Sequence, residues 1–383
     1  MNKLPSLSKG EIDFFNENGF VGPFKIYNPE EAKSILLQIR KKNSNRSKAI
    51  FNNSVDYDRH FDIPELTAHI GHPEIIGRIQ SLLGQDILGW RTEFHAKFNG
   101  ASGTAWHQVK TYQFSSGHPQ ILPTLELANE PYDLTVWTTF TESTKENGCM
   151  KFIPGSHKKL FYDENKTSKN ALEGEYRSID SGTDFYGYDF SDYVIDPSWN
   201  PDDEEIVALE MQPGECVIFT SLCVHGSYPN TTKRSTRFAI ANRYVPTHTR
   251  VYPDLEEFDS HGSHFDLKNY ATVLLSGEDQ FHHNRVTQTN VHGEKFPHYP
   301  RKSNHVDIEN VIISIWKKTL SINENITPSD NFFDLGGHSL HMMDIQTEIN
   351  KHLNINVKIS DLFEYPTAAS LSNHVETIMN NEK

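Results

Sequence analysis

Two histidines and two arginines have side chains that could together hold a metal ion and an acid. His107 lies in the segment Thr104-Ala105-Trp106-His107-Gln108-Val109-Lys110, and His225 lies in Cys223-Val224-His225-Gly226-Ser227. Arg237 follows twelve residues after His225, and Arg243 comes next. A ferrous centre needs two imidazoles on one face of the ion, and an arginine can pair with the carboxylate of a cosubstrate. The order and separation of the four residues fit that need.

Alternation along the chain relates the two arginines to each other. If residues 237–243 form one strand, Arg237, Ala239, Ala241 and Arg243 share a face. Two small residues between two arginines would leave room for an anion. The alternative is an edge strand whose two arginines face solvent.

The same rule predicts which neighbour of His107 shares its surroundings. On a strand, position 109 faces the same way as His107, whereas Gln108 and Lys110 face away. Position 109 is valine, which cannot ligate a metal. His157 follows Pro154-Gly155-Ser156 and is assigned to a turn, not to a metal site.

A serine near the C-terminus is a candidate for covalent modification. Ser339 ends the run Asp330-Asn331-Phe332-Phe333-Asp334-Leu335-Gly336-Gly337-His338-Ser339, where an amphipathic helix begins. Serine is a common helix N-cap and Gly-Gly a common turn, so the serine alone proves little. The complete run, the helix after it and a later Tyr365-Pro366-Thr367 make a far more specific pattern.

This pattern resembles the phosphopantetheine attachment site of peptidyl carrier proteins in non-ribosomal peptide assembly. The resemblance implies that a phosphopantetheinyl transferase attaches 4'-phosphopantetheine to Ser339, which then presents an aminoacyl thioester. The sequence contains no adenylation domain, so a separate adenylation enzyme would load the amino acid. The tethered substrate could be on this carrier or on that of another protein.

Residues around the histidines carry a second resemblance. The segments are Trp106-His107-Gln108, Thr135-Val136-Trp137-Thr138, Asn147-Gly148-Cys149, Phe152-Ile153-Pro154-Gly155-Ser156-His157, Phe185-Tyr186-Gly187-Tyr188-Asp189, His225-Gly226-Ser227-Tyr228-Pro229 and Arg243-Tyr244-Val245-Pro246. They resemble the phytanoyl-CoA dioxygenase-like family of iron and 2-oxoglutarate enzymes. Within it, they are most similar to the enzymes that chlorinate carrier-bound amino acids, such as the threonyl halogenase of syringomycin assembly. The segments cover most of residues 5–300.

The family resemblance implies a fold and a set of roles. The fold would be a double-stranded β-helix, also called a jelly roll or cupin fold, which is mainly β with added helices. His107 and His225 would be the iron ligands, and Arg237 would anchor 2-oxoglutarate. Thr104, Thr135 and Trp137 would line the cosubstrate pocket. Arg243 would lie near the open coordination positions of the iron.

Val109 departs from both branches of this family. Hydroxylating members have a carboxylate two residues after the first histidine, and the halogenases have Ala or Gly there, so that chloride can bind the metal. We therefore expect an iron(II)/2-oxoglutarate-dependent halogenase that attacks an unactivated carbon of the tethered aminoacyl group, with chloride as a further cofactor. Two alternatives stay open. Water could fill the position and give a hydroxylase or desaturase, or a degenerate site could serve only as a carrier-binding scaffold.

The elements that must position these residues are mainly strands. Ser8 and Glu11 form a capping box for a first helix that ends at Gly19, and residues 30–41 predict a second. From about Asp86 onward, short strands at 134–140, 216–219 and 238–245 favour a sandwich or jelly roll over a parallel sheet. The polar segment 158–205 is either a lid over a binding site or a surface insertion.

The chain is long enough for two domains with a linker. We expect an oxygenase-like domain at 1–290, a polar, proline-punctuated linker at 291–304 and a small four-helix carrier domain at 305–383. In the carrier, Val306–Leu320 predicts a first helix. A second helix begins at Ser339 and is expected to turn Leu340, Met343, Ile345, Ile349 and Leu353 inward. Leu371 and Val375 belong to a last helix. The carrier region is acidic, with eleven Asp and Glu against five Lys and Arg.

Composition limits the partners and the compartment. The 383 residues have a formal net charge of −15, which argues against nucleic acid or an anionic membrane surface as a partner. Three cysteines without framework spacing suit a reduced environment. No secretion signal and no membrane-spanning run are evident, so the cytoplasm is the expected location.

Overall fold

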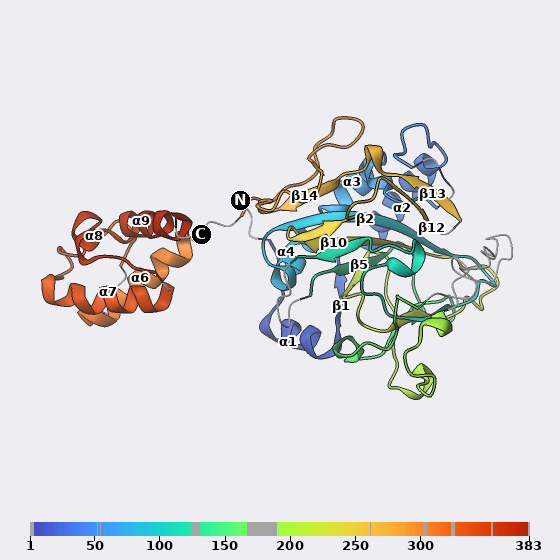
Figure 1. Cartoon of the computed structure of the whole chain (residues 1–383), viewed down its shortest axis with the longest axis horizontal. Helices are drawn as coiled ribbons and strands as arrows, with labels where there is room; N and C mark the ends of the chain where they lie inside the picture. The colour runs from blue at the N-terminus through green and yellow to red at the C-terminus, as the bar shows by residue number, and fades with distance from the viewer. Residues whose placement is uncertain are drawn as a thin grey trace. The chain divides into compact units, whose positions relative to one another are not determined.

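The computed structural model describes residues 4–51, 53, 55–124, 131–166, 190–260, 262–301, 305–322, 326–353 and 355–381. The chain divides into two compact units, Met1–Arg301 and Lys302–Lys383 (Figure 1). Each unit has its own hydrophobic core and is described by itself.

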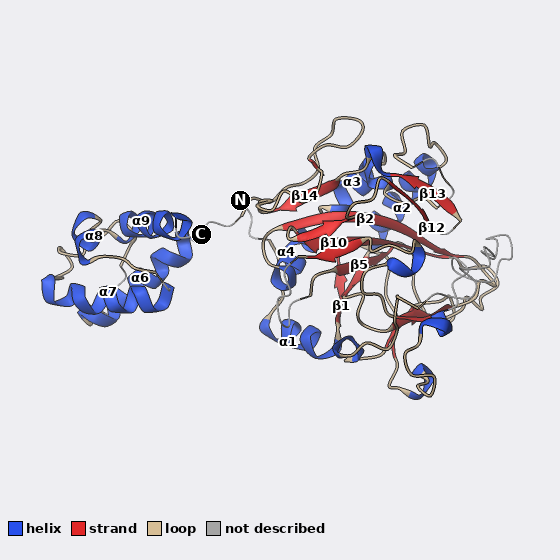
Figure 2. Ribbon diagram, viewed as in Figure 1, coloured by secondary structure: helices blue, strands red, loops and turns tan. Residues whose placement is uncertain are grey.

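Two largely antiparallel sheets form the centre of the first unit (Figure 2). The seven-stranded sheet has the order β1 (Phe20–Lys25), β8 (Glu215–Phe219), β5 (Leu134–Thr139), β10 (Arg237–Pro246), β2 (Ile87–Lys97), β14 (Thr272–Ser276) and β15 (Val286–Thr287). The four-stranded sheet has the order β3 (Thr104–His107), β9 (His225–Ser227), β6 (Met150–Phe152) and β7 (Val207–Leu209). Only the β14–β15 pair is parallel among the described strand pairs. The expected jelly-roll class, mainly β with helices, is confirmed.

Helices cover the outer face of the larger sheet. They are α1 (Lys9–Asn18), α2 (Pro29–Asn43), α3 (Pro64–Ile70) and α4 (Pro73–Leu83). The capping box of Ser8 and Glu11 starts α1, and Gly19 ends it in the left-handed region at φ 83°, as the sequence predicts. Leu36 and Ile39 of α2 pack against Phe238 and Ile240 of β10. The inner face of β10 is thereby left to face the smaller sheet.

Small elements complete the first unit. The two-stranded pairs are β11 (Thr249–Val251) with β4 (Ile121–Pro123), and β12 (Glu257–Ser260) with β13 (Ser263–Asp266). Short 3-10 helices lie at Arg59–Phe61, Gln113–Ser115, Ser156–Lys158, Phe190–Tyr193, Pro201–Asp203 and Leu267–Asn269. Among the described segments, no helix is long and apolar enough to cross a membrane.

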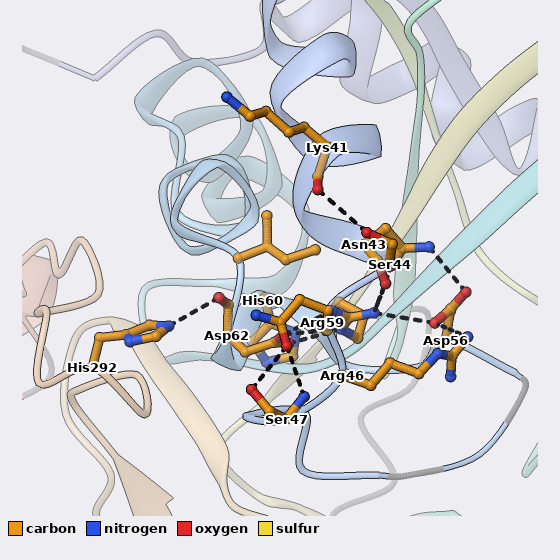
Figure 3. A network of polar contacts seen from close by, with 12 residues as sticks. Lys41, Asn43, Ser44, Arg46, Ser47, Asp56, Arg59, His60, Asp62 and His292 are labelled. Carbon is orange, nitrogen blue, oxygen red and sulfur yellow. Dashed lines mark hydrogen bonds and ion pairs between the residues drawn. The ribbon is translucent and has the colours of Figure 1, made fainter.

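The end of the first unit differs from the expected linker at 291–304. Phe296 belongs to the main hydrophobic core, and the Tyr299 backbone N–H donates to the Leu275 carbonyl at 3.0 Å. His292 lies against the backbone carbonyl of Asp62, beside a buried network around Arg59 (Figure 3). Residues 291–301 are therefore part of the folded unit, because their apolar side chains complete its core. The rest of the expected linker, 302–304, lies outside the described residues.

The second unit is a small helical bundle. Its helices are α6 (His305–Leu320), α7 (Ser339–Leu353), α8 (Ile359–Glu364) and α9 (Ala368–Asn381). The first-helix prediction is close to α6, and Leu371 and Val375 of α9 are fully buried, as expected. The inward stripe predicted for α7 is partly wrong. Leu340 and Met343 are 74% and 60% exposed, and Met342 is buried with Ile345 and Ile349 instead.

Candidate functional site

A pocket lies between the two sheets of the first unit, and it collects the residues that the sequence singled out there. Its wall includes His107, His225, Val109, Thr104, Thr135, Trp137, Arg237 and Arg243. They come from β3 and β9 of the smaller sheet and from β5 and β10 of the larger one. His157 is not among the lining residues, and its ring contacts the carbonyl of Asn16.

The two histidines stand side by side on paired strands. His107 of β3 pairs with His225 of β9, and their ring centroids are 4.1 Å apart. The Nδ1 of His107 contacts the Ala105 carbonyl at 2.8 Å, and that of His225 contacts the Cys223 carbonyl at 2.7 Å. A carbonyl can only accept, so Nδ1 carries the proton and Nε2 has the lone pair. Two neutral imidazoles held in this way fit a divalent metal ion.

Burial favours the neutral form of both rings. Removal from water is the main cause that lowers the pKa of His107 to about 4, and it holds the pKa of His225 well below its usual value. Among the described residues, no third histidine, cysteine or carboxylate joins the pair in a group that could hold a metal.

Val109 shares the pocket with His107, whereas Gln108 points away. The Val109 N–H donates to the Ser221 carbonyl at 2.9 Å, and the valine side chain lies in the core beside the pocket. The Gln108 amide nitrogen donates to the carbonyls of Lys159 and Leu222, at 2.8 and 2.7 Å. Its oxygen accepts from the Phe161 N–H at 2.8 Å. These contacts fix which side chain faces the histidines.

Arg237 is a buried cation with no acidic partner. Its Nε donates to the Gly148 carbonyl at 3.1 Å, and its Nη1 donates to the His95 carbonyl at 2.9 Å. The guanidinium lies over the ring of Trp137, 4.9 Å from the centroid. No carboxylate of the described residues forms an ion pair with it, and burial lowers its pKa to about 10. The donor set and the missing counter-charge suit the carboxylate of a ligand.

Arg243, by contrast, is already paired within the protein. Its Nη2 donates to Oε2 of Glu93 at 2.7 Å, and its Nη1 donates to the hydroxyl groups of Tyr112 and Thr135. Arg237 and Arg243 do share the inner face of β10, as alternation predicts. Of these two arginines, Arg237 is the one without an ion pair among the described residues.

The pocket also contains residues that the sequence did not indicate. Strand β2 turns Arg91, Glu93, His95 and Lys97 toward it. Tyr112 lies on the wall with a left-handed backbone at φ 64°, and its hydroxyl also contacts Ser221. The available signal was the alternation of charged with apolar residues along β2. Such a pattern is typical of a solvent-facing strand, so by itself it does not indicate a site.

A segment of the expected lid holds the loop after His107. The carboxylate of Glu164 accepts from the Thr111 N–H and hydroxyl, at 2.6 and 2.8 Å, and from the Tyr112 N–H at 3.1 Å. Phe190 stacks on His107, with ring centroids 4.7 Å apart. Glu164 and Phe190, both within the segment 158–205, thus contact residues of the pocket. Residues 167–189, including the motif Phe185–Asp189, lie outside the described residues.

Ser339 is the first residue of α7 and is exposed. The two glycines before it are needed by the local backbone. Gly336 has a φ of 89°, and a Cβ on Gly337 would come within 2.3 Å of the Phe332 ring. Since Phe332 is buried in the bundle core, the Gly-Gly turn packs on it and presents the serine to solvent.

Comparisons with known proteins agree with this arrangement. Residues 15–239 match the model of the phytanoyl-CoA dioxygenase family, and residues 310–375 match that of the phosphopantetheine attachment site. The structure "CytC3 with Fe(II) and alpha-ketoglutarate" is 35% identical, with a TM-score of 0.61, and the match covers 78% of this chain and 99% of that one.

Two curated relatives match different parts of the chain. The 2-aminoethylphosphonate dioxygenase of the uncultured bacterium HF130_AEPn_1 is 24% identical over 205 residues, which is 52% of this chain and 63% of that protein. The nonribosomal peptide synthetase kk1B of Curvularia clavata is 39% identical over 80 residues, which is 21% of this chain. The chain spans only 1% of the length of that synthetase.

The match to the first family covers more than half of the chain and contains both histidines and Arg237. The second match contains Ser339 and coincides with the helical unit. The family of the dioxygenases acts through ferrous iron and 2-oxoglutarate, and the paired imidazoles and the unpaired arginine fit these two groups. This chain, with a phosphopantetheine attachment domain at its C-terminal end, belongs to the phytanoyl-CoA dioxygenase family.

Proposed function

We propose that the first unit is an iron(II)/2-oxoglutarate-dependent halogenase. Its substrate is an aminoacyl group held as a phosphopantetheine thioester on a carrier domain, and the position attacked is an unactivated carbon. His107 and His225 hold the iron through Nε2, and Arg237 binds a carboxylate of 2-oxoglutarate. Thr104, Thr135 and Trp137 line the cosubstrate pocket.

One observation carries the halogenase proposal, namely the nature of position 109. A carboxylate here would complete three protein ligands on one face of the metal. The Val109 side chain instead lies beside the two imidazoles and supplies no donor atom. The position is thus left to an exogenous ligand. Chloride is the ligand proposed, because Arg243 and the hydroxyl groups of Tyr112, Thr135 and Ser221 make this wall polar.

The protein's own residues then have separate tasks. When bound, iron with 2-oxoglutarate and oxygen supplies an oxidant able to remove hydrogen from an unactivated carbon. The backbone carbonyls of Ala105 and Cys223 keep both imidazoles in the tautomer that can ligate. Arg237 and Trp137 orient the cosubstrate. Glu93 fixes the guanidinium of Arg243, so that its position does not depend on the substrate.

The second unit supplies the carrier. Ser339 is the proposed attachment site of 4'-phosphopantetheine, with a phosphopantetheinyl transferase and a separate adenylation enzyme as partners. Whether the thioester oxidised is on this carrier or on that of another protein is part of the test. The protein is proposed to act in the cytoplasm, where its partners would be made.

Hydroxylation or desaturation of the same tethered substrate is a second candidate, favoured by a specific observation. Valine puts two methyl groups beyond alanine next to the metal-binding imidazoles, which reduces the room for chloride. Water is smaller and can use the same hydroxyl groups as partners. A degenerate carrier-binding scaffold is the third outcome, and it predicts that the protein does not bind iron.

Intact-protein mass spectrometry of the loaded holo-protein tests the proposal. The carrier is loaded with candidate amino acids and incubated with ferrous iron, 2-oxoglutarate and oxygen, with and without chloride. A mass gain of one chlorine in place of hydrogen supports the proposal. Oxidation that is equally efficient without halide would overturn it in favour of the hydroxylase, and absence of iron binding would favour the scaffold.

Variants at position 109 sharpen this test. Val109→Ala should raise the chlorinated fraction, because it enlarges the space for the halide, and Val109→Asp should suppress chlorination by filling the position. Val273→Ala is the matched control, since Val273 is equally buried but lies in β14, away from the pocket. Ser339→Ala should abolish addition of the pantetheine. Unchanged modification of that variant would contradict the carrier assignment.

A further inference from the structure

At one end of the pocket, two buried cations lie directly opposite each other. Arg237 of β10 pairs in register with Lys97 of β2, and both side chains line the pocket. Each residue is 3% exposed. Like charges opposite each other in a sheet are unfavourable, and burial increases the cost. Such a pair calls for a negative charge nearby.

No described carboxylate supplies that charge. Glu93, the acid two positions before His95 on β2, is already shared by Arg91, His95 and Arg243. Neither Lys97 nor Arg237 forms an ion pair with any acid in the described part of the chain. The pair is therefore a preformed anion site, to which Lys97 adds a charge that the sequence did not reveal.

Gly148 lies against both Arg237 and Lys97, and its lack of a side chain leaves room for the lysine. Its carbonyl accepts from Nε of Arg237 at 3.1 Å. A Cβ on Gly148 would lie 2.4 Å from Cδ of Lys97 and 2.7 Å from the Tyr228 carbonyl oxygen. The residue has a φ of 96°, which also favours glycine. The backbone here thus fits around the lysine side chain.

Lys97 begins a chain of hydrogen bonds that ends at Thr104. Its Nζ donates to the carbonyls of Ser102 and Tyr228, each at 2.9 Å, and to Oγ of Ser227 at 2.8 Å. The Ser227 oxygen also accepts from the Thr104 N–H at 3.1 Å. The Ser227 hydroxyl and Oγ1 of Thr104 are 2.8 Å apart.

The direction of this chain follows from the donors. An ammonium group and a backbone N–H can only donate, so the Ser227 oxygen accepts twice. Its one proton is then left for Oγ1 of Thr104. The proton of Thr104 itself is not used in the chain, and Thr104 lines the pocket. A charged Lys97 therefore makes the Thr104 hydroxyl a donor toward the pocket.

We propose that Lys97 is a positioning residue for the cosubstrate: through Ser227 it orients the Thr104 hydroxyl to donate to the carboxylate that Arg237 binds. This inference rests on the proposed function, because it assigns a further residue to the 2-oxoglutarate site. Lys97 acts through charge and through Thr104, without having to touch the ligand.

The protonation state of Lys97 determines the direction of the hydrogen bonds from Lys97 through Ser227 to Thr104. A neutral amine could accept the Ser227 proton. Ser227 would then accept from Thr104, whose lone pairs would face the pocket and repel a carboxylate. Burial lowers the pKa of Lys97 to about 7, with contributions from Arg237 on β10 and Lys151 on β6, and Cys149 opposes them. A bound carboxylate favours the ammonium form, so binding at pH 8 should take up a proton.

Calorimetric titration of the full chain with 2-oxoglutarate, with Mn(II) in place of iron, tests the proposal without turnover. Lys97→Met should weaken binding roughly tenfold, the effect of losing a hydrogen bond to a charged group. Thr104→Val should weaken it similarly, and the loss in the double variant should be smaller than the sum of the two single losses. Lys42→Met is the matched control and should bind as the wild type does, because Lys42 pairs with Glu65 and does not line the pocket.

Proton uptake gives an independent readout. At pH 8, the binding heat of the wild type should depend on the ionisation enthalpy of the buffer, and that of Lys97→Met should not. Equal affinity of Lys97→Met and the wild type, or additive losses in the double variant, would overturn the inference alone. If Lys97→Met does not fold, Ser227→Ala interrupts the same series of hydrogen bonds and replaces Lys97→Met in the comparison with Thr104→Val and the double variant. Failure of the wild type to bind 2-oxoglutarate would overturn the proposed function as well.

Discussion

Charged side chains of the pocket fall into two groups at the scale of single residues. Glu93 and Arg243 satisfy each other, and their geometry is set before any ligand arrives. Arg237 and Lys97 have only neutral partners and repel each other. The first group shapes the wall, and the second is the proposed source of the affinity for an anion.

Replacement of Arg237 separates binding from stability. Arg237→Met keeps an apolar stem over Trp137 but removes the charge. The loss of a charge-assisted pair costs about 1.5–3 kcal/mol, so the affinity for 2-oxoglutarate should fall by roughly 10- to 150-fold. Calorimetry measures this, and thermal unfolding without cosubstrate measures separately the cost of losing the hydrogen bonds to the Gly148 and His95 carbonyls. Unchanged affinity would show that the anion binds elsewhere.

Sequence motifs identified His107 and His225, which neighbour Trp106 and Gly226, and the spacing from His225 identified Arg237. They did not identify Glu93 or Lys97. Both are charged residues on a strand whose alternation looks like that of an exposed surface. Their burial depends on the second sheet, which covers this face and is formed by residues far away in the sequence. No local pattern carries that information.

Among the elements, helix ends were more predictable than helix faces. The capping box at α1 is a local interaction between Ser8 and Glu11, so four neighbouring residues determine it. The buried face of α7 depends on contact with other helices of the bundle. Its apolar residues allow two overlapping stripes, and packing selects the one through Met342, leaving Leu340 exposed. Sequence periodicity alone could not distinguish the two.

A buried histidine in α3 makes stability depend on pH. His69 is fully buried, its Nδ1 lies 3.0 Å from the Tyr27 hydroxyl, and burial lowers its pKa to about 3. In the unfolded chain its pKa is about 6.5, so the unfolded state binds the proton more tightly. The stability that neutral His69 contributes is complete above pH 6.5 and is lost as the pH falls toward 3. The maximal slope is about 1.4 kcal/mol per pH unit.

Denaturant unfolding at pH 7.5 and 5.5 checks this prediction. The His69→Gln variant should lose less stability between the two values than the wild type does. The exposed His118 is a suitable control, since His118→Gln should behave as the wild type. If the free energy of unfolding of His69→Gln changes with pH as that of the wild type does, the neutral form of His69 is not the source of this pH dependence.

The loop before β6 can be tested with a single added methyl group. Gly148→Ala should displace Lys97 or the backbone, because a Cβ there has no room. Overpacking of this kind typically costs about 1–3 kcal/mol of unfolding free energy. Gly100→Ala is the matched control, because Gly100 also has a positive φ, of 79°, but nothing within 4 Å of its Cβ. Equal losses in both variants would mean that only backbone strain matters.

At the scale of the whole molecule, the two units were predictable, but the point where the first one ends was not. The polar and proline-rich residues after 290 look like a linker. Their few apolar side chains nevertheless fill the core, and Tyr299 donates its hydroxyl proton to the Gly71 carbonyl at 3.0 Å. A short segment with two or three anchoring residues has too little periodicity to predict its packing.

Truncation tests whether the first unit ends at residue 290 or at residue 301. A chain that ends at residue 301 should keep the stability of the first unit, whereas one that ends at 290 should lose it. Burial of Phe296 alone is worth about 1.5–3 kcal/mol, and the contacts of Tyr299 add to that. Chemical denaturation followed by tryptophan fluorescence measures the difference. Equal stability of the two truncated chains would mean that residues 291–301 belong to the linker and not to the folded unit.

The contacts of Gln108 have a consequence for how distant ligands affect the metal. One face of this short segment presents His107, and the amide of Gln108 is bonded to the backbone of residues 159–161. Metal binding and the arrangement of that surface segment therefore share one free energy of coupling. A carrier or substrate that prefers the arrangement favoured by the metal increases the affinity of the protein for the metal. The metal increases the affinity for that carrier or substrate by the same factor, because coupling between two sites is reciprocal. We expect the proposed iron site at His107 to retain its metal best when a substrate that prefers this arrangement is bound.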